Sequence, residues 1–265
     1  MDSQQYFSNG DLQAAVDTCA AELRKEPTNF VRRYFFAELL SLQGQWERAD
    51  KQLETLAQQD PAHGLQCTVF RQLIRAETAR LDVFHRGRAP SFLADPTPTL
   101  TQHLRALVAL GENELDEAAA LLGEAESDRP ETSGRLNGGQ TFDDIRDMDD
   151  VTASFFELLT AHGTYYWVPF DQVTEVDFVP PKRARDLLWR PAHLELQGGQ
   201  SVDGFVPALY VDTSQNDDDH LKLGRATAWS DSQGPVRGTG LRMYLVGEQD
   251  YSIFELNCLQ FGADG

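Results

Sequence analysis

The histidine, serine and cysteine residues of this 265-residue chain lack the spacings that catalytic or metal-binding side chains need. The six histidines follow none of the short intervals typical of metal ligands, and no Gly-x-Ser-x-Gly elbow supplies a nucleophile. A glycine-rich phosphate loop is also absent. We therefore predict a non-enzymatic protein with no catalytic residue, no metal ligand and no cofactor. The alternative is an enzyme, or a regulatory module that binds a metal or small molecule in its C-terminal part.

Carboxylates are concentrated between residues 143 and 150, in the sequence Asp-Asp-Ile-Arg-Asp-Met-Asp-Asp. Converging carboxylate oxygens would suit a hard divalent cation. The stretch nevertheless lacks the Asp/Asn alternation and the final Glu of a calcium loop. We expect a solvated loop whose carboxylates pair with Arg146 or cap a helix that starts at Val151. Weak metal binding is the alternative.

Acidic residues outnumber basic ones by 42 to 23, which gives a formal net charge of −19. Such a surface repels the phosphates of nucleic acids and anionic membranes, so neither is an expected partner. Two Gly-Gly-Gln sequences, at 138–140 and 198–200, are therefore explained as turns and not as a hydrolysis motif. Three distant cysteines without a Cys-x-x-Cys pair, and a start without a signal segment, predict a cytoplasmic protein.

Basic, polar and aromatic side chains in the N-terminal half could hold another protein. Arg71 and Arg75 are one helical turn apart and share a face. On the concave side of a helical array, such side chains can bind a guest helix. The predicted contact residues are Arg33, Tyr34, Trp46, Arg71, Gln72 and Arg75. The alternative is an internal salt-bridge network with Glu38 and Glu77 as counter-ions.

Helical hairpins are expected to position these side chains. Between Pro27 and Pro61, two apolar stripes with helical spacing meet at Gly44. The same pattern recurs one tetratricopeptide period earlier. A longer helix is predicted over 63–84, and a degenerate third hairpin follows, with Thr99 or Thr101 as its first cap. Residues 1–130 should form a tetratricopeptide-like helical solenoid.

The pattern changes after residue 130. Asn137-Gly138 is typical of a hairpin turn, and apolar residues alternate with a period of two after Gly163. We predict six strands, over 164–170, 173–179, 192–196, 205–211, 240–246 and 251–259. A short helix near 151–161 and a mobile loop at 214–220 are also expected. The predicted fold class is α+β, in which residues 131–265 form a β-rich antiparallel sheet or partial barrel.

Several stretches, taken in order, resemble the ImpE (TagJ) family of type VI secretion accessory proteins. They are Gly44-Gln-Trp-Glu-Arg-Ala49 with the preceding 33–40, then 69–77, 142–150, Tyr165-Tyr-Trp-Val-Pro-Phe170 and 185–192. The resemblance implies a cytoplasmic, non-enzymatic accessory or adaptor protein. It further implies binding to a helical segment of the small sheath subunit TssB, and a link to sheath assembly or to recycling by the ClpV unfoldase. A scaffold that joins two partners, one per domain, is another possibility.

Overall fold

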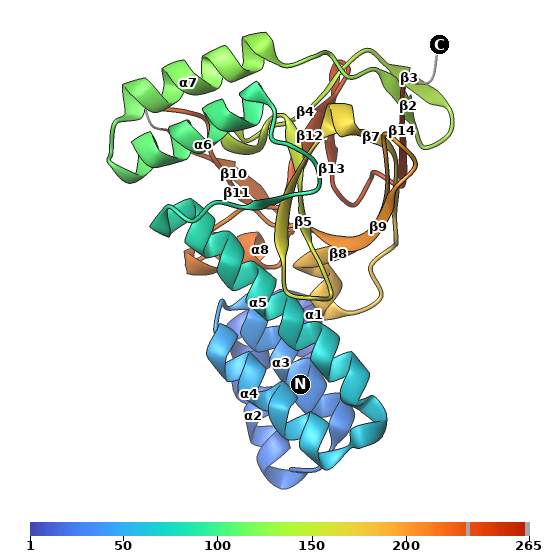
Figure 1. The fold of residues 1–265 in the computed structure, drawn as a ribbon. Helices are drawn as coiled ribbons and strands as arrows, with labels where there is room; N and C mark the ends of the chain where they lie inside the picture. Colours follow the sequence, from blue (N-terminus) through green and yellow to red (C-terminus); the bar gives the residue numbers. More distant parts are fainter. Residues whose placement is uncertain (232–233, 263–265) are drawn as a thin grey trace.

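The computed structural model describes residues 1–231 and 234–262, with most helices preceding a β-rich part (Figure 1). The helices are α1 (Ser3–Asn9), α2 (Leu12–Lys25), α3 (Phe30–Leu42), α4 (Trp46–Gln59), α5 (Gly64–Arg86), α6 (Pro98–Gly111), α7 (Leu115–Asp128) and α8 (Asp219–Lys222). Among these described helices, none combines the length and the apolarity that crossing a bilayer requires. The order of elements confirms the α+β class.

Within the described residues, the strands form a nine-stranded sheet and two small sheets. The large sheet has the spatial order β1 (Ser91–Phe92), β6 (Tyr165–Pro169), β5 (Phe155–Leu159), β9 (Ser201–Pro207), β8 (Trp189–Leu196), β7 (Val173–Phe178), β14 (Cys258–Phe261), β2 (Gly134–Leu136) and β3 (Gln140–Phe142). The small sheets pair β13 (Gln249–Ser252) and β4 (Ile145–Asp147) with β12 (Met243–Val246), and β10 (Thr227–Trp229) with β11 (Gly238–Gly240). Of these pairings only β1 with β6 is parallel, so the predicted antiparallel sheet is confirmed.

The ends of the N-terminal helices follow from capping side chains and one glycine. The Asp11 carboxylate accepts a hydrogen bond from the backbone of Ala14 at the start of α2, and Asn29 caps α3 in the same way. Gly44 has a φ of 70° and takes the left-handed conformation between α3 and α4. Helix α1, capped by Asp2, is an addition to the predicted elements.

Helices α6 and α7 form the third predicted hairpin, but they lie apart from α1–α4 and near β4 and β12 (Figure 1). Thr97, and not Thr99 or Thr101, caps α6. His103 attaches this hairpin to the sheet, because its Nε2 lies 2.9 Å from Ser154 Oγ and its ring packs edge-on against Phe155. The pair therefore packs on the sheet as well as against the end of α5, with which it lines a shared hollow.

Three local predictions are wrong. Residues 151–161 form no helix, since they contain the 3-10 turn η2 (Asp150–Thr152) and the fully buried strand β5. The acidic stretch is not a solvated loop, because it contains β4 and buries Asp147 and Asp149. Residues 214–220 include part of a 3-10 turn and the start of α8 instead of a loop alone. The hairpin turn at Asn137-Gly138 is confirmed, with φ angles of 51° and 77° between β2 and β3.

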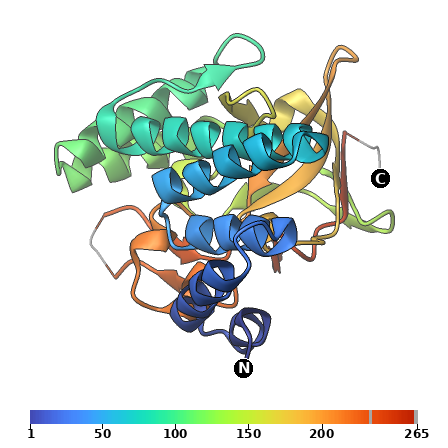
Figure 2. The same cartoon turned by 90° about the horizontal axis from the view of Figure 1, so that it is seen from below.

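Contacts between the two halves are extensive. The segment around α8 lies beside α1 and α2, as Figure 2 shows from below. The Asp219 carboxylate accepts a hydrogen bond of 2.8 Å from the backbone N–H of Leu12 at the start of α2. A negative charge at this end of a helix interacts favourably with the helix dipole. One apolar core includes Leu12, Phe70 and Trp189 and so crosses residue 130. The domain boundary at residue 130 stays a prediction.

Candidate partner-binding groove

An apolar groove lies where α1, α3 and α5 meet the segment that enters the 3-10 turn η4 (Ala184–Leu187). We call it the α3 groove. Its apolar lining consists mainly of Phe7, Phe30, Val31, Tyr34 and Phe35, and its polar lining of Gln4, Glu38, Gln66, Lys182 and Arg183. The cavity measures about 300 Å³, which is the lower end of the range common for ligand clefts. Val31 is 76% exposed and Phe7 and Phe30 are half-buried, so these three residues are accessible to another molecule, whereas Tyr34 and Phe35 are buried.

Glu38 is the one carboxylate that lines the α3 groove among the described residues. The residue is only 4% exposed, and its Oε1 has no hydrogen-bond partner in the described part of the chain. Burial raises the pKa of Glu38 to about 7, although the nearby Arg185 and Arg183 act in the opposite direction. Because an unsatisfied buried acceptor is costly, the groove contains a group that would gain from a hydrogen-bond donor.

Arg185 fixes one wall of the groove. Its guanidinium Nη1 donates a hydrogen bond of 3.2 Å to the hydroxyl of Tyr34 in α3. The same guanidinium lies 5.3 Å from the ring centroid of Phe70 in α5 and 5.7 Å from that of Phe205 in β9. Through these contacts, residues 182–187 of the C-terminal half are held against two helices of the N-terminal half.

The predicted contact residues Tyr34 and Trp46 lie in different environments. Tyr34 lines the α3 groove. The Trp46 ring stacks on Trp189 of β8, with 5.9 Å between centroids and an interplanar angle of 28°. The chain's own sheet therefore covers the part of the helical array where Trp46 lies.

Arg71 takes part in a salt bridge between neighbouring helices. Its Nε lies 2.7 Å from Asp50 Oδ1 of α4, and its Nη2 lies 3.8 Å from Glu54. An internal salt bridge, the alternative considered from the sequence, thus exists for Arg71. Its counter-ions are Asp50 and Glu54, and not the expected Glu38 and Glu77. Glu77 instead pairs with Arg80, at 3.0 Å.

The remaining predicted residues do not line the α3 groove. Arg33 donates hydrogen bonds to Gln52 Oε1 and to the carbonyl of Pro27. Gln72 and the exposed Arg75 lie against the turn at Gly163, between β5 and β6. The structure consequently divides the six candidates between the groove, the interior and the outer side of the helices.

A network of buried charges joins α5 to the sheet. Arg80 makes two hydrogen bonds to Glu157 of β5, and Arg242 pairs with both Glu157 and Asp147. Burial opposes ionisation of Glu157, but Arg80 and Arg242 outweigh this effect and lower its pKa to about 2. Tyr165 donates a further hydrogen bond to the same carboxylate. The network holds the helices and the sheet in one arrangement.

The acidic stretch supplies ion-pair partners for arginines. The pairs are Asp144 with Arg129, Asp147 with Arg242, Asp149 with Arg237 and Asp150 with Arg146. The expected pairing of this stretch with Arg146 is thereby confirmed. A carboxylate was also expected to cap a helix that starts at Val151. Asp149 caps a turn there, but the turn is the 3-10 turn η2. The carboxylates connect β4 and η2 to neighbouring segments.

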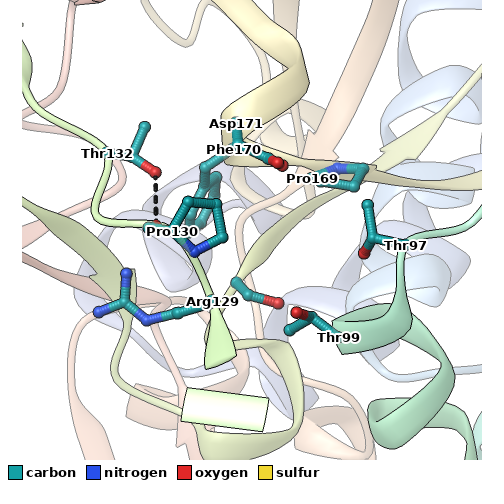
Figure 3. Close-up of a pocket in the computed structure, with 9 residues that line it drawn as sticks. Thr97, Thr99, Arg129, Pro130, Thr132, Pro169, Phe170 and Asp171 are labelled. Atoms are coloured by element: carbon teal, nitrogen blue, oxygen red, sulfur yellow. Dashed lines mark hydrogen bonds between the residues drawn. The ribbon is translucent and has the colours of Figure 1, made fainter. Parts of the chain in front are cut away.

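A second hollow lies between α6, the end of α7 and the end of β6, as Figure 3 shows. Thr97, Thr99 and Thr132 contribute hydroxyl groups to it, and burial raises the pKa of the Asp171 carboxyl at its edge. Its volume is about 30 Å³, which accommodates about one or two water molecules. This hollow suits ordered water better than a substrate.

Glu175 and Asp177 of β7 and Cys258 of β14 are the described residues whose spacing could suit a metal ion. Their ligand atoms lie within 4.8 Å of one another. Burial, with Asp177 and Glu175 adding to it, raises the pKa of the Cys258 thiol to about 12. Since a thiolate is the form that binds metals, Cys258 keeps its proton at neutral pH. The geometry alone does not define a metal centre.

Sequence reasoning missed most of the groove lining. It treated Glu38 only as a counter-ion and did not select Phe30 or Val31. One signal was available, because Glu38 is an acid inside an otherwise apolar helical run from Phe35 to Leu40. The contribution of Arg185 could not be read from local sequence, since it lies about 150 positions away from Tyr34.

The arrangement of helices and sheet is shared with a solved structure. A crystal structure of protein VPA1032 from Vibrio parahaemolyticus superimposes on this chain with a TM-score of 0.90 and 28% sequence identity. The match covers 99% of this chain and 98% of the VPA1032 chain. The molecule is thus an α+β protein of a fold already seen in bacteria.

Sequence comparisons define the family. Residues 139–260 match the family model described as ImpE protein. The type VI secretion system accessory component TagJ of Pseudomonas aeruginosa is 30% identical over 98% of this chain and 91% of its own length. This chain therefore belongs to the ImpE (TagJ) family of type VI secretion accessory proteins.

Proposed function

We propose that this protein is a non-enzymatic adaptor that holds a helical segment of the small sheath subunit TssB in the α3 groove. Family membership supports a role in type VI secretion. The observation that carries the proposed binding mode is the accessible apolar cavity on the first helices of the hairpins, with Val31 76% exposed. Accessible apolar surface of this kind is typical of interaction sites.

An amphipathic helix suits this groove for a geometric reason. Its apolar side chains recur at intervals of three and four residues and so form one stripe. The α3 groove offers the aromatic rings of Phe7, Phe30 and Phe35 to such a stripe. Each fully buried guest side chain contributes about 1.5–3 kcal/mol, and several of them offset the cost of ordering the segment. We expect micromolar or tighter affinity.

This adaptor would act in the cytoplasm, beside the sheath and the ClpV unfoldase. Capture of a sheath subunit could promote sheath assembly or present the subunit for recycling. The charge of −19 favours guests with basic side chains and opposes binding to nucleic acid or anionic membrane. Tyr34 is the sequence-predicted contact residue that we retain for this groove.

A pair of matched substitutions tests the groove. Val31→Glu places a charge in the lining, whereas Val108→Glu places the same charge on α6, where Val108 is 55% exposed outside the groove. Titration calorimetry with purified TssB should show at least tenfold weaker binding for Val31→Glu and wild-type affinity for Val108→Glu. Equal affinities of both variants and the wild type would refute the proposed site.

The face of α5 that carries Arg71, Gln72 and Arg75, beside the turn at Gly163, is the competing surface. The double variant Arg71→Ala/Arg75→Ala, checked for folding by circular dichroism, separates the two sites. At least tenfold weaker TssB binding in this variant, together with normal binding by Val31→Glu, would move the site to α5. Normal binding by the double variant supports the groove.

A further inference from the structure

The α3 groove has an unusual composition, because a single buried carboxylate lies among aromatic side chains. We propose that the guest helix presents a lysine or arginine side chain to Glu38. This inference rests on the proposed function of the groove and specifies the chemistry of its guest at one position.

The charges around Glu38 are unevenly distributed. Arg183, Arg185 and Asp186 approach it from the segment 182–187. In the described structure, the polar groups that α1 and α5 add to the groove lining are the uncharged amides of Gln4 and Gln66. The side of the groove formed by α1 and α5 therefore provides no counter-ion for the carboxylate.

Of the nearby cations, Arg185 contacts groups other than Glu38 through its guanidinium, while Lys182 and Arg183 line the groove. Arg185 donates to the Tyr34 hydroxyl, and its Nε lies 3.8 Å from Asp186. Glu38 Oε1 is left without a hydrogen bond in the described part of the chain. A rotation of this carboxyl group toward the cavity would let it accept a hydrogen bond from a guest ammonium or guanidinium group.

A basic side chain also matches the walls of the groove. The aliphatic stem of lysine or arginine packs on apolar surface, while its charged end reaches a polar group beyond. The Phe7 and Phe35 rings of the lining can attract the same cation, whereas the Phe30 ring already lies against Tyr34 and His63. A neutral donor would satisfy Glu38 but would gain little from these rings or from the negative charge of the protein.

Binding should then depend on pH in a defined direction. Burial raises the pKa of Glu38 to about 7 in the free protein, against the effect of Arg185 and Arg183. A guest cation favours the ionised carboxylate, so its binding lowers this pKa and releases a proton. Affinity should rise as the pH increases through about 7.

Glu38→Gln tests the proposal, because it removes the charge and keeps the shape of the side chain. Calorimetry with TssB should show about tenfold weaker binding at pH 8 and a flat response between pH 6 and 8. Glu54→Gln, an exposed glutamate of α4, is the control and should bind like the wild type.

Changes in the guest identify the contact independently of how well Glu38→Gln folds. Each lysine and arginine in the bound TssB segment is replaced singly by methionine. One of these TssB replacements should weaken binding to the wild-type protein about tenfold. The same replacement should not weaken binding to the Glu38→Gln variant any further. If no replacement couples to Glu38 while Val31→Glu still weakens binding at least tenfold, the charge proposal fails and the groove remains. If Val31→Glu also binds normally, the proposed function itself fails.

Discussion

Arg80 in α5 and Glu157 in β5 form an ion pair with two hydrogen bonds, Nε to Oε1 at 2.8 Å and Nη2 to Oε2 at 3.0 Å. Neither side chain is more than 4% exposed. Glu157 also accepts hydrogen bonds from Arg242 and Tyr165, so helix and sheet converge on one carboxylate. This contact joins α5, a helix that also lines the α3 groove through Gln66, to the central sheet.

Replacing Glu157 by Gln should destabilise the whole protein. The substitution leaves Arg80 and Arg242 buried with fewer counter-charges, which typically costs about 3–5 kcal/mol. Urea unfolding monitored by circular dichroism measures the change. Asp82→Asn removes the partner of the exposed Arg86 and should cost at most about 1 kcal/mol. Equal losses for the two variants would contradict a role of Glu157 in joining the halves.

His103 should make the protein sensitive to acid. Burial lowers its pKa from 6.5 to about 4, so the unfolded chain takes up a proton between these values and the folded chain does not. Neutral His103 therefore adds to the free energy of unfolding, and this stabilisation is complete above pH 6.5. It is lost as the pH falls toward 4, which lowers the free energy of unfolding by an amount on the order of 3 kcal/mol.

The variant His103→Gln isolates this effect. Between pH 7.5 and 4.5, its unfolding free energy should fall less steeply than that of the wild type. The exposed His162→Gln should retain the wild-type slope. Parallel curves for His103→Gln and the wild type would show that His103 is not buried in its neutral form.

Trp46 should contribute to stability and not to partner binding. Its ring stacks on Trp189, whose indole N–H donates a 2.9 Å hydrogen bond to Glu77. Because Trp46 is only half-buried, Trp46→Ala should cost less than the about 3–5 kcal/mol typical of a fully buried tryptophan. Thermal unfolding measures this loss, and calorimetry on the folded variant should give TssB affinity within about twofold of the wild type. A tenfold loss of affinity without a loss of stability would return Trp46 to the binding site.

Helix positions were predictable because their signals are local. Asn29 caps α3 and Gly44 ends the turn after it, and both act within a few residues. Strand β5 was not predictable in the same way, because all five of its residues are buried. A short apolar run without alternation does not distinguish a buried strand from a helix.

The groove could be anticipated only in part. Tyr34 was recognised as a candidate on a helical hairpin, and it does line the cavity. The segment at Arg183 and Arg185 reaches α3 from far along the chain, and no periodicity in the sequence encodes that contact. The same long-range packing covers Trp46 with Trp189.

Site-specific crosslinking tests the central claim most directly. The photoreactive amino acid p-benzoylphenylalanine is introduced at position 31 in the groove, at position 75 on α5 and at position 108 on α6, and each protein is irradiated with TssB. Mass spectrometry should find a covalent adduct from position 31, joined to a helical segment of TssB, and none from position 108. Adducts from position 75 or 108 without one from position 31 would contradict binding in the α3 groove.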